Sequence, residues 1–169
     1  MPGSGENAAE VEILNSQSPD FFMKIVWIMY NVASVACILV TIVFWSLIFP
    51  YIKLDKVDGD EVLINVQLHG ITSVIVVIEH CVSAIPIRLP HVVFTLIYGM
   101  LYVIFAGCFY AADHRHVMYP NILDFSNPKN TAIVCVVTAF VGLPLIQLFL
   151  FALYKFRTWL FDKLCPEEL

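Results

Sequence analysis

The sequence predicts an all-α fold, a polytopic transmembrane helix bundle with about four spans. Of its 169 residues, 60% are hydrophobic and only 14% are charged, a composition typical of integral membrane proteins. Four apolar stretches are each long enough to cross the hydrocarbon core, which takes about 20 helical residues. Trp, Tyr, Lys and Arg gather near their ends, as at membrane–water interfaces. We therefore expect a disordered polar tail over 1–20, the bundle over 21–157 and a short tail over 158–169.

The first expected span covers about residues 24–49 and ends before Pro50, because proline cannot continue a helix. Asn31, Ser34 and Thr41 share one of its faces. Small polar side chains within a span usually pack against other helices. We expect that role here, rather than catalysis by Thr41.

The second expected span, about 62–85, is apolar overall yet carries ionisable side chains. Its polar residues fall on or beside one face of a helix that turns by about 100° per residue: Asn65, His69, Thr72, Ser73, Glu79, His80 and Ser83. Ionisable groups inside a span are costly, face the bundle interior and often mark functional sites. The sequence therefore predicts a polar site within the membrane, against which other spans pack.

The third expected span, about 91–112, follows a short turn that contains two prolines. The second and third spans therefore form an antiparallel hairpin. This turn places Arg88 near Glu79, and we expect a salt bridge between them. Polar and aromatic side chains recur at helical spacing along the third span: His91, Thr95, Tyr98, Tyr102 and Phe109. We expect this stripe to face the polar stripe of the second span, because each polar group in lipid needs a partner.

The fourth expected span, about 132–154, contains Gly142 and Pro144, which predict a kink. The loop before it holds His114 and His116, which could bind a metal, but no further ligand motif accompanies them. We therefore expect no metal and no cofactor.

The charges and cysteines exclude several classes of function. The formal net charge is −5 and no basic patch occurs, which argues against nucleic-acid binding. The five cysteines lack paired spacing and predict neither a disulfide framework nor a zinc site, although Cys165 is a candidate for palmitoylation. The expected partners are the lipid bilayer and, for an enzyme, a lipid substrate; the oligomeric state stays open. The distribution of Lys and Arg favours a cytoplasmic location for both termini. We expect the protein to reside in the plasma membrane or an endomembrane.

Several short motifs resemble the rolling stone family of multipass membrane proteins. They are His69-Gly70-Ile71-Thr72-Ser73, Glu79, Ser83-Ala84-Ile85-Pro86-Ile87-Arg88, His91, Tyr98-Gly99, Tyr102, Tyr119-Pro120 and Leu123-Asp124. The resemblance covers about residues 24–154. It implies a role in membrane organisation or cell–cell fusion, because the family is named for a fly protein associated with myoblast fusion.

A more distant resemblance is to the androgen-induced and androgen-dependent membrane hydrolases, which cleave fatty-acid esters of hydroxy fatty acids. The similar positions are His69, Thr72, Ile78, Glu79, Tyr119, Pro120, Leu123 and Asp124. This resemblance implies that His69 is a catalytic base. The nucleophilic threonine of those hydrolases lies on a helix that would precede the first span here, so we expect no activity from this short chain.

Three functions therefore stay open. The chain is a membrane-organising protein, a lipid-ester hydrolase in which His69 activates a hydroxyl group, or a transporter or proton relay that uses Glu79, His80 and His91.

Overall fold

The computed structural model describes residues 21–51, 59–113, 117, 119 and 122–165. Four helices in this part of the chain are long and apolar enough to cross a membrane, which confirms the predicted all-α transmembrane bundle. These four spans cover Phe21–Tyr51, Gly59–Val82, Leu89–Ala112 and Pro128–Leu164. The tail expected at 1–20 lies outside the described residues.

Each span consists of more than one helical element. The first contains α2 (Phe21–Val43), the π-helical turn η1 (Phe44–Ile48) and the 3-10 turn η2 (Phe49–Tyr51). The second contains α3 (Gly59–Val66), the π-helical turn η4 (Gln67–Ile71) and α4 (Thr72–Val82). The third contains the 3-10 turn η5 (Leu89–His91) and α5 (Val92–Ala112). The fourth contains α6 (Pro128–Val137), the π-helical turn η6 (Thr138–Gly142) and α7 (Leu143–Leu164).

Most span ends differ from the expected bounds by two residues or more, and two of these differences have a clear cause in the sequence. The second span ends at Val82, because Ser83 has extended backbone with φ −74° and ψ 138°, and Pro86 disfavours helix in the residue before it. The fourth span continues to Leu164, so residues 158–164 are helical and not a tail. No helix-breaking residue occurs in this stretch before Pro166.

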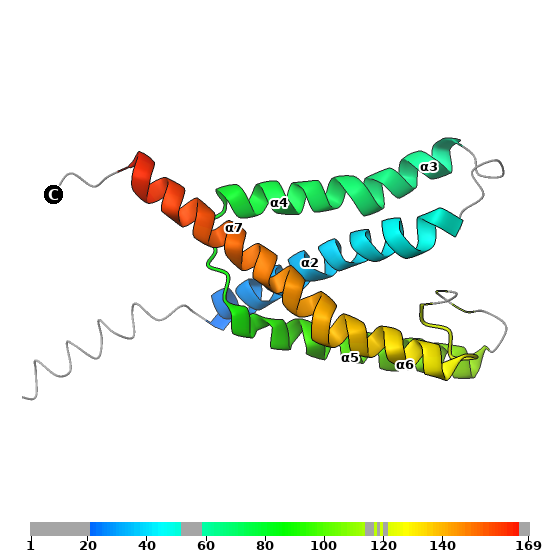
Figure 1. Ribbon diagram of the computed structural model, residues 1–169. Helices are drawn as coiled ribbons and strands as arrows, with labels where there is room; N and C mark the ends of the chain where they lie inside the picture. The colour runs from blue at the N-terminus through cyan, green and yellow to red at the C-terminus, as the bar shows by residue number, and fades with distance from the viewer. Residues whose placement is uncertain (1–20, 52–58, 114–116, 118, 120–121, 166–169) are drawn as a thin grey trace, which may run out of the picture.

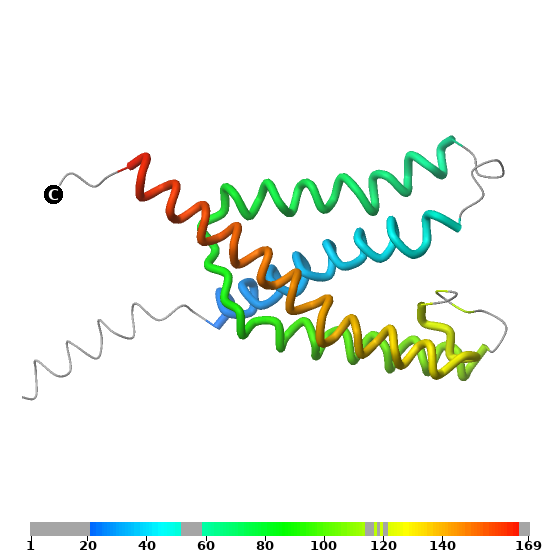
Figure 2. The backbone as a smooth tube through the Cα atoms, in the orientation of Figure 1, coloured from blue at the N-terminus to red at the C-terminus, as the bar shows by residue number. Residues whose placement is uncertain are grey.

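Helix α2 lies at the centre of the bundle. It contacts α4, α5 and α7, and α7 also contacts α4 and α5. In Figure 1, α7 crosses α2 and extends beyond the other helices at the end where α2 begins. Figure 2 shows that the spans lie close together at that end, and that the first two diverge from the last two toward the other.

The apolar core sits where α2, α7 and the segment after α4 meet. Its buried residues are Val35, Ile38, Ile87, Leu143, Ile146 and Leu150. Ile87 is only 2% exposed although it belongs to a non-helical segment. The extended segment between the second and third spans therefore packs into the bundle and is part of its core.

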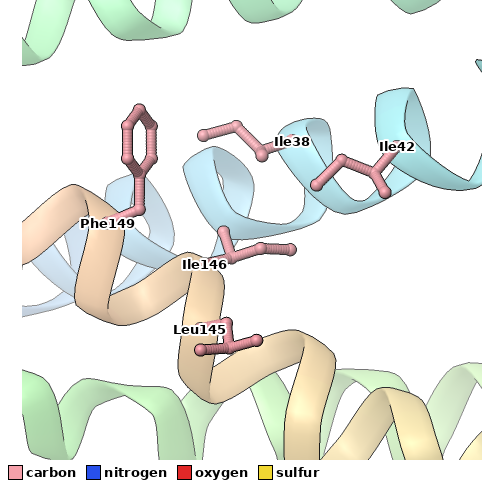
Figure 3. A pocket seen from close by; sticks show the side chains of 5 residues that line it. All are labelled: Ile38, Ile42, Leu145, Ile146 and Phe149. Atoms are coloured by element: carbon pink, nitrogen blue, oxygen red, sulfur yellow. The ribbon is translucent and has the colours of Figure 1, made fainter.

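Two apolar grooves flank α2. One, of about 330 Å³, lies between α2 and α7 (Figure 3), and its lining residues are Ile38, Ile42, Leu145, Ile146 and Phe149. The other, of about 360 Å³, lies between α2 and α5 and includes Tyr98 in its lining. The side chains that line the first groove are all apolar, so this groove is suited to contact with an apolar group.

Two of the π-helical turns precede prolines. Pro144 follows η6 and Pro50 follows η1. Proline lacks an N–H donor, and its ring clashes with the carbonyl group four residues earlier. A wider turn before the ring relieves this clash. The helix irregularity expected at Gly142 and Pro144 is therefore a π-helical turn. The third π-helical turn, η4, has no nearby proline and is described with the candidate site.

We expect Leu150→Ala to lower the free energy of unfolding by about 2–5 kcal/mol, because it leaves a cavity among side chains that are fully buried. Reversible unfolding by SDS in mixed micelles would measure this change. Leu148→Ala is the matched control, since Leu148 is 50% exposed on the same helix. Equal effects of the two substitutions would contradict the assigned core.

Candidate functional site

The polar face of the second span lies against the first span. His69, Ser73 and His80 each contact a first-span side chain. Asn65 is half-buried on α3, one helical turn before His69. The candidate site is therefore an interface between two helices and runs along most of their length.

His69 occupies the π-helical turn η4 and stacks on Phe44 of η1, with ring centroids 4.0 Å apart and an angle of 18° between the ring planes. Trp45 Nε1 donates a hydrogen bond to the His69 carbonyl oxygen at 2.9 Å. The two π-helical turns thus pack directly on each other. Nδ1 of His69 is buried and has no hydrogen-bond partner among the described residues.

The hydroxyl groups near His69 are engaged elsewhere. Ser73 Oγ shares a short hydrogen bond with Thr41 Oγ1 and lies 3.6 Å from Cys37 Sγ. Thr72 Oγ1 donates to the Leu68 carbonyl oxygen at 2.7 Å. Within the described part of the chain, no hydrogen bond joins the His69 ring to a hydroxyl group. Ser73 and Thr41 thus join two helices, and the described residues around His69 form no hydroxyl–imidazole pair of the kind that activates a serine or threonine nucleophile.

His80 forms a second contact between the same two spans. It is 2% exposed, and its Nδ1 lies 3.2 Å from the Tyr30 hydroxyl and 2.8 Å from the Val76 carbonyl oxygen. The Tyr30 and His80 rings stack with centroids 4.9 Å apart. The half-buried Tyr30 phenol and the buried His80 imidazole thus join α2 and α4.

The expected salt bridge between Arg88 and Glu79 is wrong. Both residues are described and no ion pair joins them; the Arg88 guanidinium lies instead over the Trp27 ring, 4.9 Å from its centroid. Glu79 is exposed on α4. The reason is that α4 ends at Val82 and extended backbone carries Arg88 toward the start of α2.

Trp27 joins the segment after α4 to the bundle. Its Nε1 donates to the Pro86 carbonyl oxygen at 2.6 Å, and His91 meets its ring edge-on with centroids 4.9 Å apart. Gln147 Nε2 donates to the Arg88 carbonyl oxygen at 2.8 Å. Side chains from α2 and α7 therefore satisfy backbone groups that a non-helical segment leaves free.

Contrary to our expectation, no hydrogen bond or ring contact among the described residues joins the third-span stripe to the second-span stripe. His91 packs on the first span, and the Tyr102 hydroxyl donates to the Tyr119 hydroxyl at 3.2 Å. Tyr98 is 52% exposed and lines the groove beside α2. The polar and aromatic side chains of the third span thus contact the first span and the loop before the fourth.

The loop motif supports the start of the fourth span. Asp124 accepts a hydrogen bond from the Ser126 backbone N–H at 2.9 Å, and its carbonyl oxygen accepts one from Thr131 Oγ1 at 2.7 Å. Phe125 packs over Gly107, at a place where a Cβ would lie 3.5 Å from its ring. Pro120 lies outside the described residues. The geometry around Asp124 indicates a structural connection between the third and fourth spans.

The described residues contain no group of three or more His, Cys, Asp or Glu side chains placed to hold a metal ion. His114 and His116 lie outside this part of the chain. Sequence reasoning missed Gln147, which is 1% exposed. An amide in an otherwise apolar span was the available signal, since such groups usually face other helices.

We expect His69→Ala to destabilise the protein and His69→Phe to preserve most of its stability, because phenylalanine retains the stack on Phe44. Loss of an aromatic pair costs about 0.5–1.5 kcal/mol beyond the lost buried area. Unfolding by SDS would compare the two variants, and a fluorophosphonate probe is expected to show no labelling that depends on His69. Labelling of the parent chain that both variants lose would contradict a structural role.

The profile of the family described as protein rolling stone matches residues 15–165. Protein rolling stone of Drosophila melanogaster is 32% identical over 148 residues, which cover 80% of this chain and 49% of that protein. The chain thus spans about half the length of this curated relative. No solved structure matches the chain, and these findings do not support the hydrolase resemblance. Because the profile match extends over all four membrane-crossing helices, the chain belongs to the rolling stone family.

Proposed function

We propose that this chain organises membranes at cell–cell contacts and takes part in cell–cell fusion, as in myoblasts. The observation that carries the proposal is the family match over the whole bundle. The resemblance stated above implies fusion, and the structure adds a physical reason to prefer a non-catalytic role. Three candidate reactive side chains of the second span contact side chains of the first span and so join the two helices. They are His69, Ser73 and His80.

The two alternatives find less support. A lipid-ester hydrolase needs a base within hydrogen-bond reach of its nucleophile, and the described hydroxyl groups around His69 bond to other groups. A proton relay needs a continuous hydrogen-bonded path. Glu79 is exposed, whereas His80 bonds to Tyr30 and His91 packs on Trp27, and no hydrogen bond among described residues links these three ionisable groups.

We further propose that the end at which α2 begins faces the cytoplasm, and that the protein resides in the plasma membrane. The start of α2, the segment between α4 and α5 and the end of α7 lie at this end (Figure 1). Five basic residues occur there in the sequence, and four flank the opposite ends of the spans. Those near the proposed cytoplasmic side are Lys24, Arg88, Lys155, Arg157 and Lys163; the others are Lys53, Lys56, Arg115 and Lys129. A cytoplasmic excess of Lys and Arg supports this orientation.

Thiol labelling tests the orientation. In a variant that retains Cys165 and has the other four cysteines replaced, we expect a membrane-impermeant maleimide to react only after the cells are permeabilised. Cys165 is exposed just beyond α7. The matched variant replaces all five cysteines and carries Lys129→Cys, at the opposite end, which should react in intact cells. The reverse pattern would overturn the proposed orientation.

A cell-mixing assay tests the function. Two populations of myoblasts with different cytoplasmic fluorescent proteins are expected to form severalfold fewer two-coloured syncytia when both lack this protein. Expression of the parent chain or His69→Phe should restore fusion, because the proposed role needs the bundle and not an imidazole. Normal fusion after verified loss of the protein would contradict the proposal, and rescue by the parent chain alone would reopen a chemical role for His69.

A further inference from the structure

Four polar side chains are almost completely buried in the half of the bundle nearer the start of α2, and each has an atom without a hydrogen-bond partner among the described residues. They are Asn31, His80, Thr95 and Gln147, which are 0%, 2%, 2% and 1% exposed. The atoms concerned are Nδ2 and Oδ1 of Asn31, Nε2 of His80, Oγ1 of Thr95 and Oε1 of Gln147. The set includes donors and acceptors from four different helices, and we call it the buried polar layer.

Contacts around the start of α2 place these residues within about one helical turn of one level. Tyr30, the residue before Asn31, bonds to His80. Trp27 meets His91, and Asn31 and Thr95 each follow four residues later on helices that run in the same direction (Figure 2). Residues four apart lie on one helical face, one turn apart. Because Trp27 contacts His91, Asn31 and Thr95 lie at the same height in the bundle, one turn farther along their helices.

Gln147 reaches the same level from α7. Its Nε2 donates to the carbonyl oxygen of Arg88, whose guanidinium covers Trp27. Val35 of α2, Ile87 and Leu150 of α7 belong to one buried cluster. Val35 and Leu150 lie about one helical turn from Asn31 and Gln147, and Ile87 precedes Arg88, so the polar layer borders this apolar core.

The Thr95 hydroxyl differs from several other helical hydroxyl groups of the described chain. Ser34, Thr72 and Thr158 each donate a hydrogen bond to the carbonyl oxygen four residues earlier on their own helix. Thr95 makes no such bond within the described chain. Asn31 likewise leaves both its donor and its acceptor free. A site with both kinds of group favours a small molecule that can donate and accept.

We propose that the buried polar layer binds ordered water between α2, α4, α5 and α7. Lipid cannot satisfy polar groups, so those inside a membrane protein bond to protein or to internal water. Bound internal water typically makes two to four hydrogen bonds to such groups, and the layer supplies five free polar atoms. Water at this position solvates the bundle end beside the non-helical segment that follows α4.

Radiolytic labelling in heavy-oxygen water tests the site, because hydroxyl radicals formed from bound water attack side chains beside it. In the full chain in nanodiscs, we expect Val35, Ile87 and Leu150 to take up label severalfold faster than Ile38. Ile38 is a similarly buried aliphatic residue that borders the apolar groove. Labelling of the exposed Leu164 shows that radicals formed. Rates at the three reporter residues equal to that of Ile38 would mean a dry layer and overturn the proposal.

Two substitutions remove water ligands. Asn31→Leu and the nearly isosteric Thr95→Val should each reduce the labelling of Val35 and Leu150 toward the Ile38 rate. Thr95→Val keeps the test valid if Asn31→Leu fails to fold. The control is Thr131→Val, since Thr131 is also buried but bonds to Asp124 at the other end of the bundle; it should leave the rates unchanged. Unchanged labelling in both layer variants would show that the water is not held by this layer.

Discussion

The architecture depends on one constraint: polar groups within a hydrocarbon-facing bundle must find partners inside the protein. The second span carries several such groups, and three of them, His69, Ser73 and His80, lie against the first span. Interhelical hydrogen bonds in membranes contribute only about 0.6–2 kcal/mol each. Several along one interface are enough to favour one rotation of a helix over others, and this rotation leaves aliphatic side chains such as Ile75 and Ile78 exposed to lipid.

The same constraint explains how a non-helical segment is tolerated beside the membrane. Backbone groups outside regular helices are admissible at this depth only where protein surrounds them. Trp27 and Gln147 each donate to a carbonyl oxygen of the segment after α4, and Ile87 anchors it in the core. This segment holds the end of the second span to two other helices, so it contributes to the bundle as a fifth packing element.

Much of the fold could be predicted from sequence, because hydropathy reports burial in lipid and helical periodicity reports which residues share a face. The four spans and the polar face of the second follow from these two signals. Periodicity does not say which neighbour a face will meet, and for that reason the pairing of the second- and third-span stripes was wrong. Nor does periodicity describe the path of the backbone between helices. Arg88 was expected near Glu79, but the extended backbone after α4 places its guanidinium over Trp27. The π-helical turn around His69 has no nearby proline from which it could be predicted, and its observed partners, Phe44 and Trp45, belong to another span.

The length of the fourth span has a consequence for the membrane in which the protein resides. Its 37 residues form a helix of roughly 55 Å, whereas the hydrocarbon core is about 30 Å thick and tilts rarely exceed about 40°. Even at that tilt, some three helical turns must leave the hydrocarbon, and Lys155, Arg157 and Lys163 mark the end at which they do. Exposed Trp159 and Phe161 on these turns suit the headgroup region. A thicker bilayer would draw more of this helix inward, so hydrophobic mismatch couples the position of its C-terminal end to membrane thickness and gives the protein a physical basis for sorting between membranes.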